Sequence, residues 1–191
     1  KLLRIGPEPD RQIWMTEQGY TLILPDDTTA PNGLFLFFQR GQIVADSALP
    51  LPNTLEYEAL ADGIGILHYS TGNPLEFFFD DSVMASSAAQ IQTLMRSKGI
   101  TNVPICVVGQ SLGGTRALRF AQFLQERKSD FGIQIAACVA VDAPLDFARF
   151  WHSSQRIIAR HFHPAADDEA RWVSYLLEQN LGGQPDDRPD A

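Results

Sequence analysis

One short stretch, residues 109–114 with the sequence Gly-Gln-Ser-Leu-Gly-Gly, constrains the fold of this chain more than any other. Residues 103–108, just before it, are apolar and rich in β-branched side chains, which predicts a strand buried on both faces. After it, Ala117, Ala121 and Leu124 share one face of a helix, while polar side chains occupy another. The stretch is therefore predicted to be a sharp, glycine-flanked turn that joins a buried strand to an amphipathic helix.

This order of elements is that of a nucleophile elbow, in which a tight turn lifts a serine hydroxyl above the edge of a sheet. The glycines two residues before and two residues after Ser111 remove side chains that would collide in such a turn. The amide of Leu112 starts the helix, so it can donate a hydrogen bond to a developing oxyanion. The alternative is an ordinary Gly-Ser turn, but the strand before and the helix after favour Ser111 as a nucleophile.

Composition narrows the class of protein. The 191 residues fit one domain with a core of normal size, and 45% hydrophobic with 20% charged residues is typical of a soluble globular protein. A net charge of −8 argues against nucleic acid and anionic membrane surfaces as partners. No apolar run approaches the length of a transmembrane span, and the two cysteines lack the spacing of metal ligands. We expect no metal and no cofactor, and the composition does not distinguish a cytoplasmic from a secreted or periplasmic protein.

Strand and helix patterns alternate along the chain. Strands are predicted at residues 12–15, 20–24, 34–39, 64–69, 103–108 and 133–141. Helices are predicted at residues 54–62, from 80 or 81 to 98, from 112 onward, from 146 to about 162, and at 167–181. Alternation of this kind predicts an α/β protein, a three-layer sandwich around a mostly parallel sheet.

The arrangement resembles the α/β-hydrolase superfamily over residues 10–145, on the Gly-Gln-Ser-Leu-Gly-Gly motif after an apolar strand. The resemblance implies a mixed sheet with an antiparallel start and a serine esterase or lipase in which Ser111 is the nucleophile. In this family the loop after the third strand supplies a second oxyanion amide. Residues 39–42 occupy that place, so Arg40 and Gly41 are the candidates, although the usual His-Gly or Gly-Gly sequence is not there.

The family's triad follows the order serine, acid, histidine along the chain. Asp142, at the end of the predicted strand 133–141, is the candidate acid, and the alternative is that it only opens the following helix. No histidine follows a seventh or eighth strand, because no such strands are predicted. Two alternatives stay open. The histidine lies beyond residue 191 in a truncated chain, or a residue within the chain replaces it.

The two helices predicted within residues 146–181 fall where lidded members of the family insert a cap. The predicted domains are therefore a hydrolase core at 1–145, a helical cap or lid segment at 146–181, and a linker-like tail at 182–191. Gln110, His68 and Trp151 are candidates for the substrate pocket. For His68 the alternative is a hydrogen-bonded structural histidine, and for Trp151 it is packing between helices.

Three classes of function follow. The first is a serine hydrolase that cleaves a carboxylic ester or related acyl bond of a small molecule through an acyl-enzyme on Ser111. The second is an acyltransferase that uses the same nucleophile. The third is a non-catalytic binding module that keeps the hydrolase fold without a base. The sequence identifies neither the substrate nor the oligomeric state.

Overall fold

The computed structural model describes residues 2–3, 11–15, 20–25, 30–38, 54–71, 80–127, 131–161 and 163–187. The described residues belong to two compact units, one that ends at Ala143 and one that starts at Pro144. Within these described ranges, no helix combines the length and the apolar character needed to cross a membrane.

A single seven-stranded sheet forms the centre of the first unit, with the strand order β1-β2-β3-β5-β4-β6-β7. The strands are β1 (Leu2–Leu3), β2 (Arg11–Met15), β3 (Tyr20–Pro25), β4 (Gly33–Phe38), β5 (Ile64–Tyr69), β6 (Ile105–Gln110) and β7 (Ile135–Val141). The pairs β1–β2, β2–β3 and β3–β5 are antiparallel, whereas the pairs β5–β4, β4–β6 and β6–β7 are parallel. The expected antiparallel start followed by a parallel block is confirmed.

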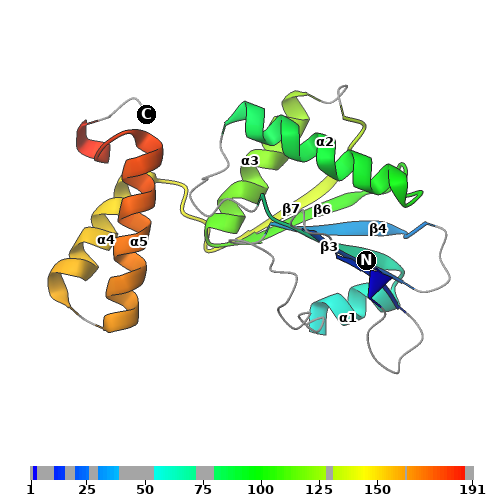
Figure 1. Ribbon diagram of the computed structural model, residues 1–191, viewed down its shortest axis with the longest axis horizontal. Coiled ribbons are helices and arrows are strands. Elements are labelled where there is room, and N and C mark those ends of the chain that lie inside the picture. The colour runs from blue at the N-terminus through cyan, green and yellow to red at the C-terminus, as the bar shows by residue number, and fades with distance from the viewer. Residues whose placement is uncertain are drawn as a thin grey trace. The chain divides into compact units, whose positions relative to one another are not determined.

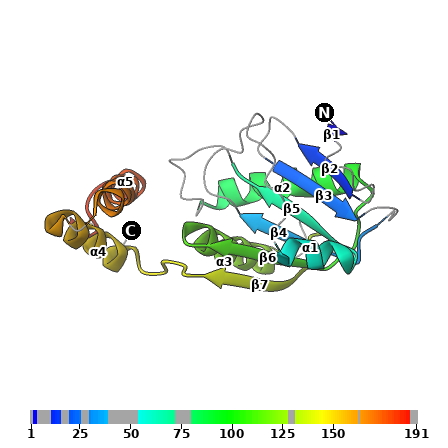
Figure 2. The same cartoon turned by 90° about the horizontal axis from the view of Figure 1, so that it is seen from below.

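Helices cover both faces of this sheet (Figure 1). Helix α1 (Thr54–Ala61) lies on one face, and α2 (Asp81–Ser97) and α3 (Leu112–Glu126) lie on the other, as Figure 2 also shows. The predicted α/β sandwich of three layers is thus confirmed. The inner face of α2 is a stripe of apolar residues at helical spacing, and all four are at most 6% exposed: Met84, Ala88, Ile91 and Met95.

The main hydrophobic core lies between the sheet and the helices α2 and α3. Phe120 of α3 is fully buried there, and its ring packs 5.1 Å from that of Phe38 on β4. We expect Phe120→Ala to lower the free energy of unfolding by about 3–5 kcal/mol, because the truncation leaves a cavity in a packed core. Urea unfolding measures this loss. Leu118→Ala, on the same helix but 37% exposed, is the control and should have a much smaller effect.

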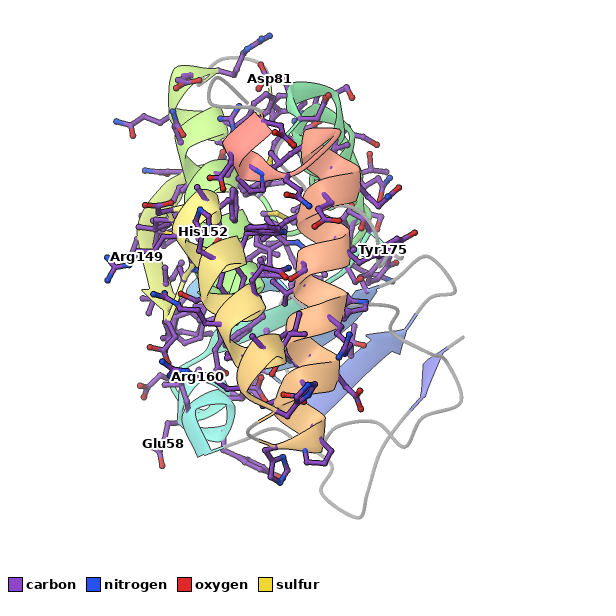
Figure 3. The ribbon with its side chains drawn as sticks, turned by 90° about the vertical axis from the view of Figure 1, so that its left-hand side faces the viewer. Glu58, Asp81, Arg149, His152, Arg160 and Tyr175 are labelled. Carbon is purple, nitrogen blue, oxygen red and sulfur yellow. The ribbon has the colours of Figure 1, made fainter. Side chains whose placement is uncertain are left out.

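The second unit contains α4 (Phe147–Arg160), α5 (Pro164–Leu181) and a short 3-10 helix at Pro185–Asp187. Figure 3 shows α4 and α5 side by side, with Arg149 and Arg160 of α4 and Tyr175 of α5 directed away from the other helix. Helix α5 starts three residues earlier than the sequence pattern suggests. Pro164 occupies the first helical position of α5, where its missing N–H leaves no hydrogen bond unmade.

Candidate active site

The serine turn, residues 109–114, joins the end of β6 to the start of α3. Ser111 has φ 52° and ψ −130°, a backbone conformation that non-glycine residues rarely adopt and that costs about 1–3 kcal/mol. Its backbone is fixed on both sides: its N–H donates to the Val141 carbonyl at 2.8 Å, and its carbonyl accepts from Gly114 N at 2.8 Å. The side chain makes no capping bond to the helix and the residue is exposed. The fold therefore holds a strained serine with its hydroxyl uncommitted to the helix.

The glycines of the serine turn are required by close backbone approaches. A Cβ on Gly109 would overlap the Gly113 carbonyl, and one on Gly113 would lie 2.6 Å from the Phe38 carbonyl oxygen. Gly114 is tight as well, since its Cβ would lie 3.0 Å from that of Ala143. Because the first two obstacles are backbone atoms, no side-chain rearrangement relieves them. This is the physical reason for the glycine spacing on which the sequence interpretation depends.

Two backbone amides stand at the start of α3 beside Ser111. The first helical hydrogen bonds are those from Gly114 N and Thr115 N to the Ser111 carbonyl, at 2.8 and 3.3 Å. The amides of Leu112 and Gly113 come before these bonds, where helix N–H groups have no partner within the helix. Such amides, at the positive end of the helix dipole, can stabilise a negative charge that develops next to the serine.

Asp142 follows β7 directly and is brought to the same edge of the sheet. The preceding residue, Val141, accepts the hydrogen bond from the Ser111 amide, so the chain at Asp142 adjoins the serine turn. Asp142 is exposed and has φ 49°, a second left-handed non-glycine residue at a neighbouring strand end. Two residues in this uncommon conformation at adjacent strand ends are typical of a functional site.

His68 lies on β5 with its side chain on the face of the sheet that α1 covers. Its Nε2 is 2.9 Å from the Glu56 Oε1 of α1, and its ring stacks on Phe37 with centroids 5.1 Å apart. The residue is only 7% exposed. This placement supports the alternative of a structural histidine that links α1 to the sheet.

The remaining histidines have polar partners within the second unit. His152 Nε2 lies 3.0 Å from Asp186, His161 Nδ1 lies 3.2 Å from Asp167, and His163 Nδ1 accepts from Ala165 N at 3.3 Å. The sequence pattern did not reveal these pairs, because each depends on how α4, α5 and the short 3-10 helix fold together.

The other candidate residues lie in different surroundings. Gln110 is exposed at the end of β6, next to Ser111. Trp151 is 8% exposed, and its Nε1 donates to Glu178 Oε1 at 2.9 Å, so it contributes to the contact between α4 and α5. Arg40 and Gly41 lie outside the described residues.

Cys106 and Cys138 are free thiols on neighbouring strands, and burial raises the pKa of both. A raised pKa lowers the thiolate fraction near neutral pH, so these residues are poor nucleophiles compared with an ordinary cysteine. We expect iodoacetamide at pH 8 to alkylate the folded protein more slowly than the urea-unfolded protein. Equal rates in the two states would contradict the burial of both thiols.

Searches for related proteins by sequence and by structure gave different results. No protein-family model matches the chain, and no curated protein matches it. Solved structures do match. A Legionella pneumophila protein with a provisional hydrolase assignment is 13% identical with a TM-score of 0.54. The match covers 90% of this chain and 51% of that protein. Esterase B from Lactobacillus rhamnosis is 14% identical with a TM-score of 0.52, and the match covers 87% of this chain and 53% of the esterase. A hormone-sensitive lipase from a metagenome library is 17% identical with a TM-score of 0.50, and the match covers 92% of this chain and 57% of the lipase.

The chain has the α/β-hydrolase fold. It spans about half the length of each of these solved proteins. Within the α/β-hydrolase fold of this chain, two supports of the serine turn escaped the sequence analysis. The Val141 carbonyl holds the Ser111 amide, and the Phe38 backbone lies against Gly113. Both contacts join strands that are distant in sequence, so no local pattern could reveal them.

Proposed function

We propose that this protein is a serine hydrolase that cleaves a carboxylic ester or related acyl bond of a small molecule, with the serine turn as its nucleophile elbow. One observation carries the proposal: the strained, exposed Ser111 sits between a parallel strand and a helix N-terminus. Strain of 1–3 kcal/mol, on the order expected for such a conformation, persists only where the surrounding structure enforces it. A turn built only to connect β6 and α3 would have no need of a serine in this conformation.

In the proposed reaction the Ser111 hydroxyl attacks the acyl carbon, and its proton passes to a general base. The amide of Leu112 donates to the oxyanion, and a second donor comes from Arg40 or Gly41. Breakage of the acyl–oxygen bond releases the alcohol, which takes the proton back, and leaves an acyl group on Ser111. Water then hydrolyses this ester and releases the acid. Asp142 orients the base from the end of β7.

The histidine that acts as the base is proposed to lie beyond residue 191 of the full-length protein. His68, the histidine of the first unit, is already bound to Glu56. The chain covers only 51–57% of three solved proteins of the same fold. In addition, β7 is the outermost strand of the described sheet, so within the described residues its outer backbone edge is open to pairing with further strands.

Hydrolysis of p-nitrophenyl butyrate by the 191-residue chain and by the full-length protein tests this proposal. We expect the short chain to show only residual catalysis, about 10³–10⁴-fold over water, because it lacks the base. The full-length protein should turn over rapidly and release the free acid even when an alcohol is added. The 191-residue chain could instead be fully active, with His152→Gln or His161→Gln removing that activity. This result would contradict the proposal that the base lies beyond residue 191. A predominant ester product with the added alcohol would identify an acyltransferase instead.

We also propose that residues 146–181 act as a lid over Ser111. Their two helices carry large side chains that are at least one-third exposed within this unit, Ile157 at 37% and Tyr175 at 50%. Nitroxide labels on cysteines introduced at Ser111 and Ile157, with Cys106 and Cys138 changed to alanine, report the distance between the two sites. We expect a short distance that lengthens when the lid opens. A single long distance under all conditions would contradict a lid.

A further inference from the structure

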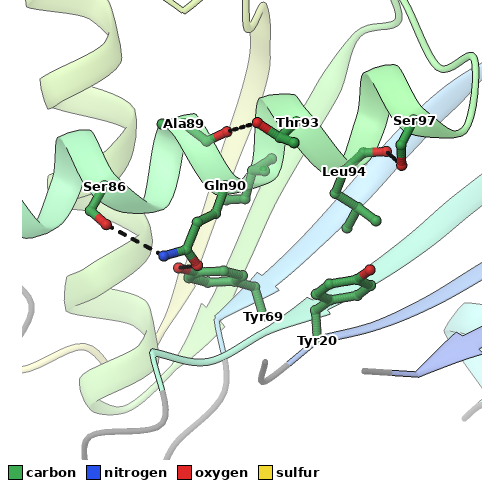
Figure 4. Close-up of a pocket in the computed structure, with 9 residues that line it drawn as sticks. Tyr20, Tyr69, Ser86, Ala89, Gln90, Thr93, Leu94 and Ser97 are labelled. Carbon is green, nitrogen blue, oxygen red and sulfur yellow. Dashed lines mark hydrogen bonds between the residues drawn. The ribbon is translucent and has the colours of Figure 1, made fainter. Parts of the chain in front are cut away.

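We propose that a pocket beside α2, separate from the serine turn, binds the pyranose ring of a neutral sugar. The pocket has a volume of about 370 Å³, within the range of small-molecule sites. It lies between the outward face of α2 and the strands β3 and β5 (Figure 4). The residues that define its chemistry are Tyr20, Tyr69, Ser86, Gln90, Thr93 and Ser97.

Two tyrosine rings form the floor of this pocket. Tyr20 and Tyr69 are directly opposite each other in the antiparallel β3–β5 pair, so their side chains stand next to each other on one face of the sheet. Figure 4 shows the two rings side by side below α2. Tyr69 is 2% exposed, and its hydroxyl is within hydrogen-bond distance of Gln90 Oε1 at 3.0 Å and Ser87 Oγ at 3.1 Å. Tyr69 is therefore held in place beneath the pocket, and the partly exposed ring of Tyr20 is the aromatic surface that a ligand can contact.

Polar side chains of α2 form the wall, and the hydroxyl protons of two of them are already engaged. Thr93 Oγ1 donates to the Ala89 carbonyl at 2.8 Å, and Ser97 Oγ donates to the Leu94 carbonyl at 2.7 Å. Each hydroxyl has one proton but two acceptor lone pairs, so these oxygens retain the capacity to accept. Thr93 and Ser97 thus offer acceptors, and they fit a ligand that carries several O–H donors.

The uncharged lining of the pocket favours a neutral ligand. None of the described residues that line it is charged, so an ion placed there would lose hydration without gaining a counter-charge. A pyranose combines a ring face of C–H groups, which can cover the Tyr20 ring, with a rim of hydroxyl donors for the wall. A flat heteroaromatic ring would cover Tyr20 as well, but it carries few donors.

This site does not depend on Ser111. In the strand register Tyr69 pairs with Phe38, and Phe38 pairs with Gly109, so one whole strand separates the pocket from the serine turn. Two strand spacings amount to about 10 Å. A sugar bound here would therefore leave the serine turn unoccupied, and its binding can be measured in a protein without the nucleophile.

Titration of the ¹⁵N-labelled Ser111→Ala protein with methyl α-D-glucopyranoside tests the proposal. We expect a Kd of about 1 mM, a usual affinity for a ligand of this size. The amide shifts should be concentrated between residues 86 and 97. Tyr20→Ala and Gln90→Leu should each weaken binding about tenfold, since each removes a wall or floor contact. Gln90 is exposed on the helix surface, so its replacement leaves the core intact. Tyr175→Ala, a half-exposed tyrosine of α5, is the matched control and should leave the Kd unchanged.

Three results would overturn the sugar assignment. The first is the absence of shifts up to about 50 mM glucoside, well above the expected Kd. The second is an affinity that neither variant changes. The third is tighter binding of cyclohexylammonium than of the glucoside, which would reassign the tyrosine floor to a cation.

Discussion

Replacement of Ser111 by alanine is expected to lower kcat/KM for ester hydrolysis by the full-length protein by a factor of about 10⁴ or more. The variant keeps the oxyanion amides but has no hydroxyl to form the acyl-enzyme, so only transition-state binding remains. Initial rates with p-nitrophenyl butyrate give this ratio. The control is Ser153→Ala, since Ser153 lies on α4 and its Oγ accepts a hydrogen bond from Arg156 at 3.0 Å. An alanine variant at position 111 with near-normal kcat/KM would contradict Ser111 as the nucleophile.

Gly113→Ala is expected to lower the free energy of unfolding by about 3 kcal/mol or more, at the upper end of the overpacking range. The new Cβ would lie 2.6 Å from the Phe38 carbonyl oxygen, so β4 and the start of α3 would have to separate. The same movement would displace Ser111 and the amides of α3, and we expect activity to fall with stability. Urea unfolding followed by circular dichroism measures the first effect.

Gln122→Ala is the matched control for that variant. Gln122 lies on the exposed surface of the same helix and bonds only to Glu126, at 2.9 Å. Such a pair contributes about 0.2–0.5 kcal/mol. If Gly113→Ala had an equally small effect, the close approach of α3 to β4 could not be the reason for the glycine.

Local sequence patterns predicted much of this fold because its main elements are locally encoded. The stripe of α2 repeats at helical spacing, and the strand at β6 is a continuous apolar run, so each required no knowledge of its neighbours. The serine turn is local only in part. A Cβ on Gly109 would overlap Gly113, four residues later, whereas a Cβ on Gly113 would meet Phe38, which is distant in the sequence.

Local sequence patterns could not predict contacts between segments that are distant in the sequence. His68 is a pocket candidate in the sequence, and only the docking of α1 shows that Glu56 lies next to it. Trp151 is likewise a pocket candidate in the sequence, and only the packing of α4 with α5 shows that its indole donates to Glu178, 27 residues later. In both cases the partner of a side chain depends on how two helices or a helix and a sheet pack. The position of Asp142 needed only topology, because the end of a parallel strand lies at the sheet edge where Ser111 lies, and its role as the acid stays a prediction.

Labelling with a fluorophosphonate probe tests the central claim most directly. The probe phosphonylates an activated serine, so mass spectrometry of the digested full-length protein should locate one adduct on Ser111. Ser111→Ala should abolish the adduct, and the unfolded protein should not react. An adduct that persists in the alanine variant and maps to another residue would contradict the account of this protein as a hydrolase that acts through Ser111.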